Sequence, residues 1–393
     1  MSSAQNVNVP LLDLAPQNGE IDAELTEAFR RVLHSCRYIM GPEVEAFERD
    51  TAALCQTRHG IGVSSGTDAI LLALMALGVG PGDEVIVPAF TFFATAGCVA
   101  RVGATPVWAD VCPHSFNIDL ADAAKKTGPR TKAIIPVHLF GQSADMDAVL
   151  AFASERGLRV IEDCAQSLGA KWHGRPVGSF GDLGAYSFFP SKNLGGFGDS
   201  GLLTANDDAL AERARILRVH GMEPKYYHKF VGGNFRMDPL QAALLAVKLP
   251  RLAGYNSRRA AHAAAYHAAL GALPGVASNT PDAPADALLL LPVDFSGEGI
   301  WNQFTLRVSG GAARRDSLRA HLAARSIGSD IYYPLSLDQQ ECFRGIGRGG
   351  ETIRVAGRLG GEVLSIPVYP DLSAEQHAAV VAAIREWLEL QTA

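Results

Sequence analysis

Short apolar segments alternate with helix-like segments between residues 59 and 205, and this alternation limits the chain to few folds. Nearly continuous apolar strands separated by helices are typical of a mainly parallel sheet that helices cover on both faces. The fold class is therefore α/β, and ligands of such sheets gather at the carboxyl ends of the strands. We predict strands at 59–64, 84–88, 105–111, 132–138, 158–163, 184–189 and 201–204, and helices at 69–77, 94–102 and 146–156.

The remainder of the chain is helical at first and then mixed. Helical spacing covers 207–220 and 238–270, and the Pro-, Gly- and Asn-containing segment 273–284 indicates a linker. A strand at 300–308 and helices at 314–325 and 374–387 fit a smaller α+β domain. We expect a large domain over 1–255, including an N-terminal helical segment, and a small C-terminal domain over 256–393.

Charge and cysteine content exclude several classes of protein. The 393 residues carry a formal net charge of −6 without a long basic run, which does not favour nucleic acid or an anionic membrane as partner. The six cysteines form no CxxC pair and no metal-ligand pattern with histidine, so we expect reduced thiols and no metal. The N-terminus lacks a basic region followed by an apolar one, and the apolar run at 69–80 is too short to span a bilayer. We therefore expect a cytoplasmic protein.

Two residues carry the strongest chemical signal. Asp163 ends an apolar strand, and Lys192 lies in a loop that is rich in glycine. A lysine amine forms a Schiff base with an aldehyde, and a carboxylate keeps a pyridine nitrogen protonated. Together these properties describe a site for pyridoxal 5′-phosphate (PLP). Alone, Asp163 is equally consistent with a metal ligand or a helix cap, and Lys192 with a solvated surface lysine.

The segment 64–68, Ser-Ser-Gly-Thr-Asp, joins a strand to an apolar helix. A helix N-terminus presents free N–H groups and partial positive charge, which suit a phosphate. Gly66 allows a close backbone approach, and Thr67 adds a hydroxyl. The alternative is a plain capping turn with Thr67 or Asp68 as the cap, which is the commoner role of such a turn.

Four other residues have a functional interpretation, and two of them, Phe92 and Asn234, also have a plain one. Phe92 follows a strand end, where its ring would stack on a flat heterocycle or pack in the core. Gln166 follows Asp163 closely and would donate to a ring oxygen. Ser187 would contribute a hydroxyl to a phosphate. Asn234 precedes a long helix and is also consistent with an ordinary turn, with Asp238 as the cap.

Taken in order, these segments resemble the DegT/DnrJ/EryC1/StrS family of sugar aminotransferases. The resemblance runs from about residue 38 to 249, and a weaker likeness continues at 331–334. Its most specific parts are Ile-Glu-Asp-Cys-Ala-Gln-Ser-Leu-Gly-Ala at 161–170 and Ser-Phe-Phe-Pro-Ser-Lys at 187–192. It implies a fold-type-I PLP enzyme that is active as a homodimer with shared sites.

The resemblance also implies a role for each candidate residue. Lys192 would hold PLP covalently and move the proton as general acid and base. Asp163 would pair with the pyridinium nitrogen. The other cofactor contacts would come from Gln166 on the ring oxygen, Phe92 on the ring face, Gly66, Thr67 and Ser187 on the phosphate, and Asn234 on the phosphate of the neighbouring subunit.

The implied reaction is a ping-pong transfer of an amino group from L-glutamate to a nucleotide-linked keto-sugar. Its product would be an aminosugar for a surface polysaccharide, lipid A or a glycosylated metabolite. Tyr332 and Tyr333, in Tyr-Tyr-Pro-Leu-Ser-Leu, resemble members that act on 3-keto sugars, which we favour over 4-keto sugars. This chain has Asn302 and Asp338 where relatives often have histidine, in segments expected to face the sugar.

The sequence argues against three other functions. Some relatives are sugar dehydratases with histidine in place of the Schiff-base lysine, and Lys192 argues against that activity. A non-catalytic PLP-binding regulator is the second alternative, but the sequence has no helix-turn-helix or basic patch. A Rossmann dinucleotide binder is the third, and the first strand–helix turn lacks the G-x-G-x-x-G pattern.

Overall fold

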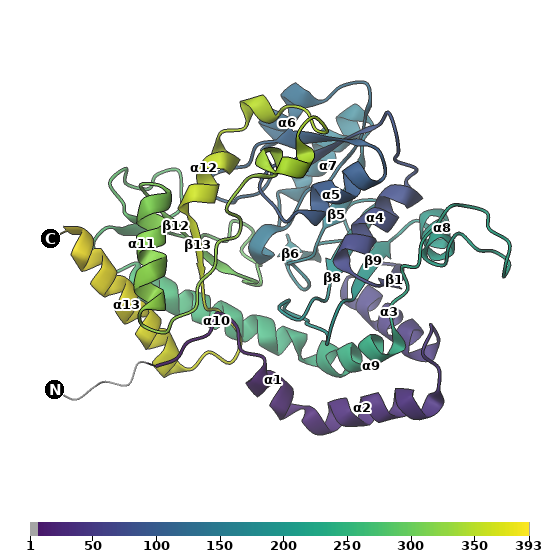
Figure 1. The fold of residues 1–393 in the computed structure, drawn as a ribbon, viewed down its shortest axis with the longest axis horizontal. Coiled ribbons are helices and arrows are strands. Elements are labelled where there is room, and N and C mark those ends of the chain that lie inside the picture. Colours follow the sequence, from purple (N-terminus) through teal and green to yellow (C-terminus); the bar gives the residue numbers. More distant parts are fainter. Residues whose placement is uncertain (1–6, 393) are drawn as a thin grey trace.

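A computed structural model describes residues 7–392, and its centre is a seven-stranded sheet (Figure 1). The strand order is β1–β9–β8–β5–β4–β2–β3. Strand β9 is antiparallel to both of its neighbours, and every other pairing in this sheet is parallel, as the predicted α/β class requires. The strands are β1 (His59–Val63), β2 (Glu84–Pro88), β3 (Thr105–Ala109), β4 (Thr131–Ile134), β5 (Arg159–Asp163), β8 (Leu183–Ser187) and β9 (Gly201–Ala205).

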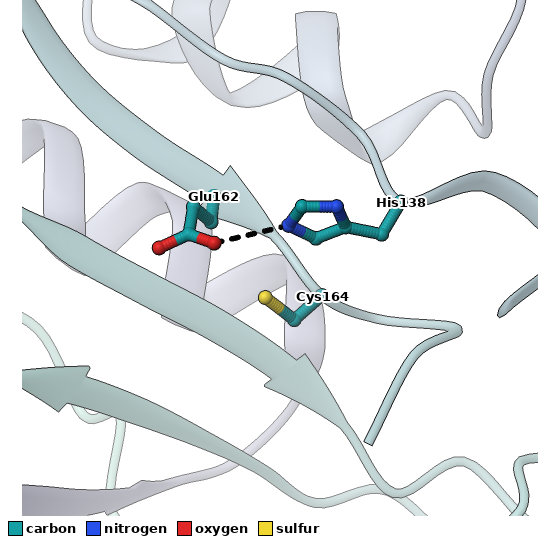
Figure 2. A group of neighbouring side chains, drawn as sticks. All are labelled: His138, Glu162 and Cys164. Atoms are coloured by element: carbon teal, nitrogen blue, oxygen red, sulfur yellow. Dashed lines mark hydrogen bonds and ion pairs between the residues drawn. The ribbon is translucent and has the colours of Figure 1, made fainter. Parts of the chain in front are cut away.

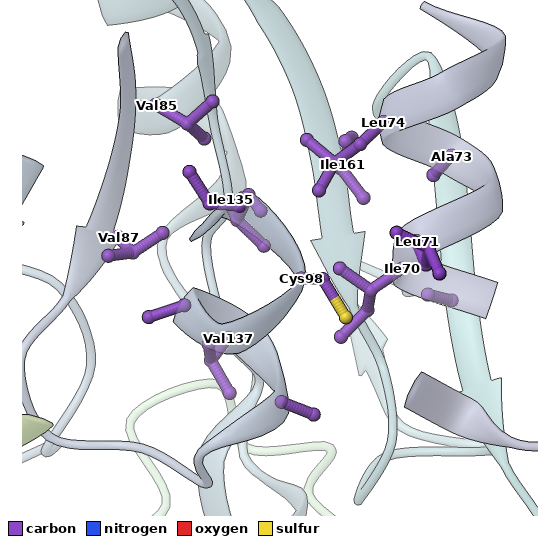
Figure 3. Close-up of a cluster of buried hydrophobic side chains, with 14 of the residues drawn as sticks. Ile70, Leu71, Ala73, Leu74, Val85, Val87, Cys98, Ile135, Val137 and Ile161 are labelled. Atoms are coloured by element: carbon purple, nitrogen blue, oxygen red, sulfur yellow. The ribbon is translucent and has the colours of Figure 1, made fainter. Parts of the chain in front are cut away.

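Helices cover both faces of this sheet, which explains why its strands are apolar at nearly every position. On one face α4 (Gly66–Ala76), α5 (Ala94–Arg101) and α8 (Asp208–Arg218) pack together. Their core includes Ile70 and Leu74 of α4 together with Val85, Val87 and Ile161 of the strands (Figure 3). Side chains alternate between faces along a strand, so Ile86 points the other way. It packs with residues of α6 (Leu120–Lys126) and α7 (Met146–Arg156).

The N-terminal helical segment forms three helices that lie against the large sheet domain. They are α1 (Ala15–Glu20), α2 (Asp22–Ser35) and α3 (Pro42–Leu54). Figure 1 shows α2 running beside α9 (Pro239–Lys248), and Ala28 and Val32 of α2 pack with Ala243 of α9.

A second, four-stranded sheet has the order β10–β11–β12–β13 and a separate core. Its strands are β10 (Val276–Ser278), β11 (Leu289–Leu291), β12 (Phe304–Val308) and β13 (Val363–Ile366), and a further hairpin pairs β6 (Lys171–Trp172) with β7 (Arg175–Pro176). Helices α10 (Leu252–Leu270), α11 (Ala312–Ala323) and α13 (Ala374–Thr392) pack around it, and α12 (Val355–Glu362) precedes β13.

The two parts are more interleaved than one boundary after residue 255 suggests. Helix α10 passes through that point without interruption. Val9 is buried in the second core, where it pairs with Ile327. Leu337 and Leu359, by contrast, lie in the core of the large sheet. The boundaries 1–255 and 256–393 therefore stay a prediction.

Several predicted elements have different limits in the structure. The stretch 238–270 is two α-helices, because a 3₁₀ turn at Leu249–Arg251 contains Pro250, which lacks the N–H that a continuous helix needs. The strand predicted at 132–138 ends at Ile134, and the one at 300–308 begins at Phe304. The segment 273–284, expected as a linker, contains β10.

None of the helices in residues 7–392 combines the length and the apolar character that crossing a membrane requires.

Candidate active site

Four candidate residues meet where parallel strands end at one edge of the large sheet. Asp163 is the last residue of β5, and Ser187 is the last residue of β8, which pairs with β5. Gly66 begins the helix that follows β1, and Phe92 follows β2. The strand topology therefore brings together residues that are far apart in sequence, since Gly66 and Ser187 are in contact range.

Asp163 is buried and held in one orientation. The Thr95 hydroxyl donates to its Oδ2 at 2.8 Å, and the Ala165 N–H donates to its Oδ1 at 3.1 Å. Burial raises the pKa of Asp163, while these two hydrogen bonds and the charge of Lys192 oppose the rise. The carboxylate is thus preorganised to meet a positive group.

Thr95 is a site residue that the sequence analysis missed. It is completely buried on α5, and its Oγ1 lies 3.2 Å from that of Thr91. A signal was available, because two threonines four positions apart interrupt an otherwise apolar and aromatic segment.

Lys192 follows β8 in a loop and is half-buried. Burial lowers the pKa of Lys192 to about 8, and the charge of Asp163 works in the opposite direction. A lysine with its pKa lowered in this way has a substantial neutral fraction, which is the nucleophilic form. The pair therefore supplies a reactive amine beside an oriented carboxylate.

The N-terminus of α4 lies against Ser187. The helix cap is Ser65, whose Oγ accepts from the Asp68 N–H at 3.0 Å, so neither Thr67 nor Asp68 is the cap. This leaves the amides of Gly66 and Thr67 in the first turn, where no helical acceptor exists. A Cβ at position 66 would lie 2.6 Å from the Cβ of Ser187, so only glycine lets these two segments approach. Such an arrangement suits a phosphate.

An aromatic and amide group borders the pair from the other side. The ring of Phe92 is 55% exposed and its centroid lies 6.2 Å from that of Tyr333. Gln166 accepts from the Phe140 N–H at 2.6 Å and donates to the Tyr333 hydroxyl at 3.2 Å. Burial raises the pKa of Tyr333, so its hydroxyl stays protonated. Phe92, Gln166 and Tyr333 thus form one group that presents an aromatic surface.

The other candidates lie in three different places. Asn302 is buried and shares a recess with Tyr332 and with Ser191, which precedes Lys192. Asn234 is exposed, and its backbone pairs with Val219. Asp338 lies in a 3₁₀ turn at Leu337–Gln339, where its Cβ approaches Gly350. Among the interactions of residues 7–392, none joins Asn234 or Asp338 to Lys192.

One buried cluster has the composition of a metal site. The ligand atoms of His138, Glu162 and Cys164 lie within 4.8 Å of one another (Figure 2). The Ala144 N–H donates to His138 Nδ1 at 3.1 Å, so Nε2 carries the proton and donates to Glu162 Oε2 at 3.1 Å. Both ring nitrogens are therefore already in use.

Glu162 has several further partners in the same cluster. Its two oxygens accept from the N–H groups of Gly178, Phe180 and Gly181, each at 2.7 Å. With its oxygens engaged in this way, the carboxylate ties β5 to the loop that precedes β8. We interpret the cluster as a structural network rather than a metal centre.

The geometry fits the cofactor that the sequence suggested. PLP presents an aldehyde, a basic ring nitrogen, a flat ring and a phosphate. Lys192, Asp163, Phe92 and the Gly66–Ser187 junction offer one matching group for each. Each oxygen of the buried Asp163 carboxylate accepts one hydrogen bond, from Thr95 or Ala165, and the charges of Lys192 and His138 also favour its ionised form, which suits a pyridinium partner.

The family model of the DegT/DnrJ/EryC1/StrS aminotransferase family matches residues 19–385. The chain belongs to this family. The match extends well beyond the segments that carried the resemblance in sequence, and it includes the second sheet.

Relatives of known name cover almost the whole chain. A pleiotropic regulatory protein of Geobacillus stearothermophilus is 46% identical over 382 residues, which span 97% of this chain and 99% of that protein. The dTDP-3-amino-3,4,6-trideoxy-α-D-glucose transaminase of Streptomyces venezuelae is 42% identical over 391 residues, 99% of this chain and 98% of that protein. The UDP-N-acetyl-3-dehydro-α-D-glucosamine 3-aminotransferase of Acidithiobacillus ferrooxidans is 42% identical over 386 residues, 98% of this chain and 99% of that protein.

Solved structures agree with this assignment. DesV of S. venezuelae, in complex with a ketimine intermediate, superposes with a TM-score of 0.90 at 42% identity and covers 97% of this chain and 99% of its own. NtdA of Bacillus subtilis, with bound cofactor PMP, has a TM-score of 0.88 at 29% identity and covers 99% of this chain and 87% of its own. The fold is therefore that of the family's aminotransferases, and this chain is an aminotransferase.

Proposed function

We propose that this aminotransferase uses PLP to move an amino group from L-glutamate to a nucleotide-linked keto-sugar in a ping-pong reaction. The observation that carries the proposal is the juxtaposition of Lys192, whose pKa is lowered to about 8, with the buried carboxylate of Asp163. When bound, PLP supplies an aldehyde for the amine and an electron sink for the carbon that exchanges its proton.

Lys192 does two things in this proposal. Its neutral amine would hold the cofactor covalently through the aldehyde. The same Nζ would serve as general base and acid for the carbon that exchanges its proton. A pKa near 8 suits both directions of proton transfer at neutral pH.

The remaining residues hold and orient the reacting groups. Asp163, fixed by Thr95, would keep the ring nitrogen protonated. Phe92 would stack on the ring and Gln166 would contact its oxygen. Ser187, Thr67 and the first amides of α4 would hold the phosphate. Asn234 of the partner subunit would complete the phosphate site in a homodimer, a role consistent with its exposed position.

The acceptor we favour is a 3-keto sugar. Two of the relatives described above are named for amination of a sugar at the 3-position, one on a dTDP-sugar and the other on a UDP-sugar. Tyr332, Tyr333 and Asn302 lie beside the Lys192 site and would contact the sugar. Asp338 lies farther along the same segment, and we propose for it a contact with a distal part of the substrate. The product serves aminosugar synthesis in the cytoplasm.

A regulatory protein is the alternative with a specific observation in its favour, because the G. stearothermophilus relative bears that name. The filled set of Lys192, Asp163 and Ser187 favours catalysis, since a regulator does not need a nucleophilic amine. A dehydratase is disfavoured by the same lysine.

The test is the visible absorbance of the purified protein, before and after addition of L-glutamate. We expect a yellow band that bleaches with glutamate and returns with a 3-keto nucleotide sugar. A band that ignores every amino acid donor would contradict transamination. Absence of a band after PLP is added, together with sequence-specific DNA binding in a gel shift, would favour the regulator.

A further inference from the structure

A recess beside Lys192 contains a buried arginine that pairs with no carboxylate among the described residues. Arg259 of α10 is only 4% exposed. Its NH1 donates to the carbonyl oxygens of Trp301 at 3.3 Å and Asn302 at 3.2 Å, and its Nε has no acceptor. The charge of Asp371 acts on Arg259, but Arg258 binds this carboxylate at 3.4 Å. The positive charge of the Arg259 guanidinium is therefore not neutralised by a paired carboxylate among the described residues.

The same recess holds other polar atoms without partners. Asn302 is 5% exposed, and neither its Nδ2 nor its Oδ1 has a hydrogen-bond partner. The Oε1 of Gln303 is likewise buried and unpartnered. Leaving such atoms unsatisfied is costly, so several of them around one space indicate a polar ligand. The recess offers both donors and acceptors. The charge of Arg259 requires a ligand whose net charge is negative.

The position of the recess, whose lining includes Ser191, Tyr332, Arg259 and Asn302, indicates which ligand this is. The space inside it is small, about 60 Å³. Ser191 directly precedes Lys192, and Tyr332 directly precedes Tyr333, which binds Gln166. A molecule with its amine at Lys192 therefore extends its other end toward Arg259. A space of this size takes the carboxylate end of an amino acid, whereas a nucleotide does not enter it.

We propose that the Arg259 recess binds a carboxylate of the amino donor, with Arg259 as the charged contact and Asn302 as its hydrogen-bonding neighbour. The inference rests on the proposed function and adds a donor site to it. The guanidinium makes charge-assisted hydrogen bonds to the carboxylate, and its buried position makes them strong. A dicarboxylic amino acid and its keto product are the ligand class. Asn302, assigned above to the sugar, contacts the donor in the first half-reaction and the sugar in the second.

Arg258 offers a matched control, because it is the neighbouring arginine on the same helix. Its side chain pairs with Asp371 and is not part of the recess. We would titrate the yellow PLP form of wild type, Arg258→Gln, Arg259→Gln, Arg259→Lys and Asn302→Ala with L-glutamate. The non-reacting α-methyl-L-glutamate, which lacks the hydrogen to be removed, gives the affinity separately from the chemistry.

We expect Arg259→Gln to weaken both ligands by roughly tenfold to a hundredfold, with partial recovery in Arg259→Lys and no change in Arg258→Gln. Asn302→Ala removes no hydrogen bond within residues 7–392, so it tests the recess without loosening the fold, and we expect a loss of roughly tenfold. The affinity for PLP stays at the wild-type value in every variant.

Three results would overturn the inference. One is unchanged glutamate affinity in both Arg259→Gln and Asn302→Ala. Another is an unchanged donor half-reaction with a raised KM for the keto-sugar, which would assign the recess to a carboxylate of the sugar. The third is a parallel loss of PLP affinity, which would make Arg259 structural. Failure of the proposed function is distinct, because wild type itself would then not respond to glutamate.

Discussion

Lys192 and Lys248 are two lysines whose pKa burial lowers to the same value, about 8, yet their surroundings differ. Lys192 is half-buried and faces the carboxylate of Asp163. Lys248, on α9, is only 2% exposed, and its Nζ donates to the Gly195 carbonyl at 2.7 Å and to Asn18 Oδ1 at 3.4 Å. A shifted pKa thus reports burial, and the partner of the amine indicates what the lysine does.

The two lysines are also connected. Gly195 lies in the loop that follows Lys192. The buried Nζ of Lys248 therefore anchors that loop through its hydrogen bond to the Gly195 carbonyl. We regard Lys192 as the catalytic amine and Lys248 as a positioning residue. This comparison leads to predictions whose expected effects differ in size.

The largest effect is expected for Lys192→Ala. It removes both the covalent anchor and the proton carrier, so transamination falls by roughly a thousandfold or more, and the yellow band is lost after gel filtration. Lys248→Met is the control, because it keeps a long side chain but loses the bond to Gly195. We expect it to retain the band, and equal loss in the two variants would contradict the distinction between them.

A smaller loss is expected for Asp163→Asn, which keeps the shape of the side chain but removes its charge. Without the carboxylate the ring nitrogen is less readily protonated, and kcat falls by roughly a hundredfold, about 2.7 kcal/mol in barrier height. The adjacent acid provides the comparison. Glu162→Gln disturbs a network of backbone amides, so we expect a lower Tm with kcat nearly retained. A larger kcat effect at Glu162 than at Asp163 would reverse the assignment.

The smallest effect concerns pH. The amine of Lys192 is reactive only when neutral, so the rate at which apoprotein attaches added PLP should rise about tenfold per pH unit below 8 and level off above it. Asp163 raises the pKa of Lys192, so Asp163→Asn should level off at lower pH. Stopped-flow absorbance measures this rate. Lys248→Met should keep the wild-type profile, and a shifted midpoint there would show that Lys248 governs the titration.

Much of the fold could be predicted because its signals are local. Strands buried on both faces are apolar throughout, and helices separate them, so the order of elements is visible in the sequence. The breaks were harder to predict. Pro250 ends α9 although the apolar spacing continues on both sides. That continuous spacing predicts one helical stretch over 238–270, so the break at the proline is not apparent from it.

The site was predictable only where chemistry is unusual. A lysine in a glycine-rich loop and an aspartate at a strand end have few joint explanations, so Asp163 and Lys192 stood out. Thr95 was missed because its partner is 68 positions away, and Lys248 because its partner is 53 positions away. Arg259 resembles any arginine of a polar helix until tertiary packing buries it. Asp338 follows Tyr333 closely in sequence, but it lies in a 3₁₀ turn where it approaches Gly350.

Glu162 and Asp163 are adjacent acids on β5, and the pleat of a strand sends them to opposite sides of the sheet. A one-residue slip of this strand would exchange them, placing a longer acid at the reactive edge and a shorter one among the amides. The three N–H donors on Glu162 fit only one alignment, so they fix the register of the strand. Single-residue insertions and deletions in β5 should consequently be tolerated far less than substitutions, and this part of the chain should resist length variation during evolution or design.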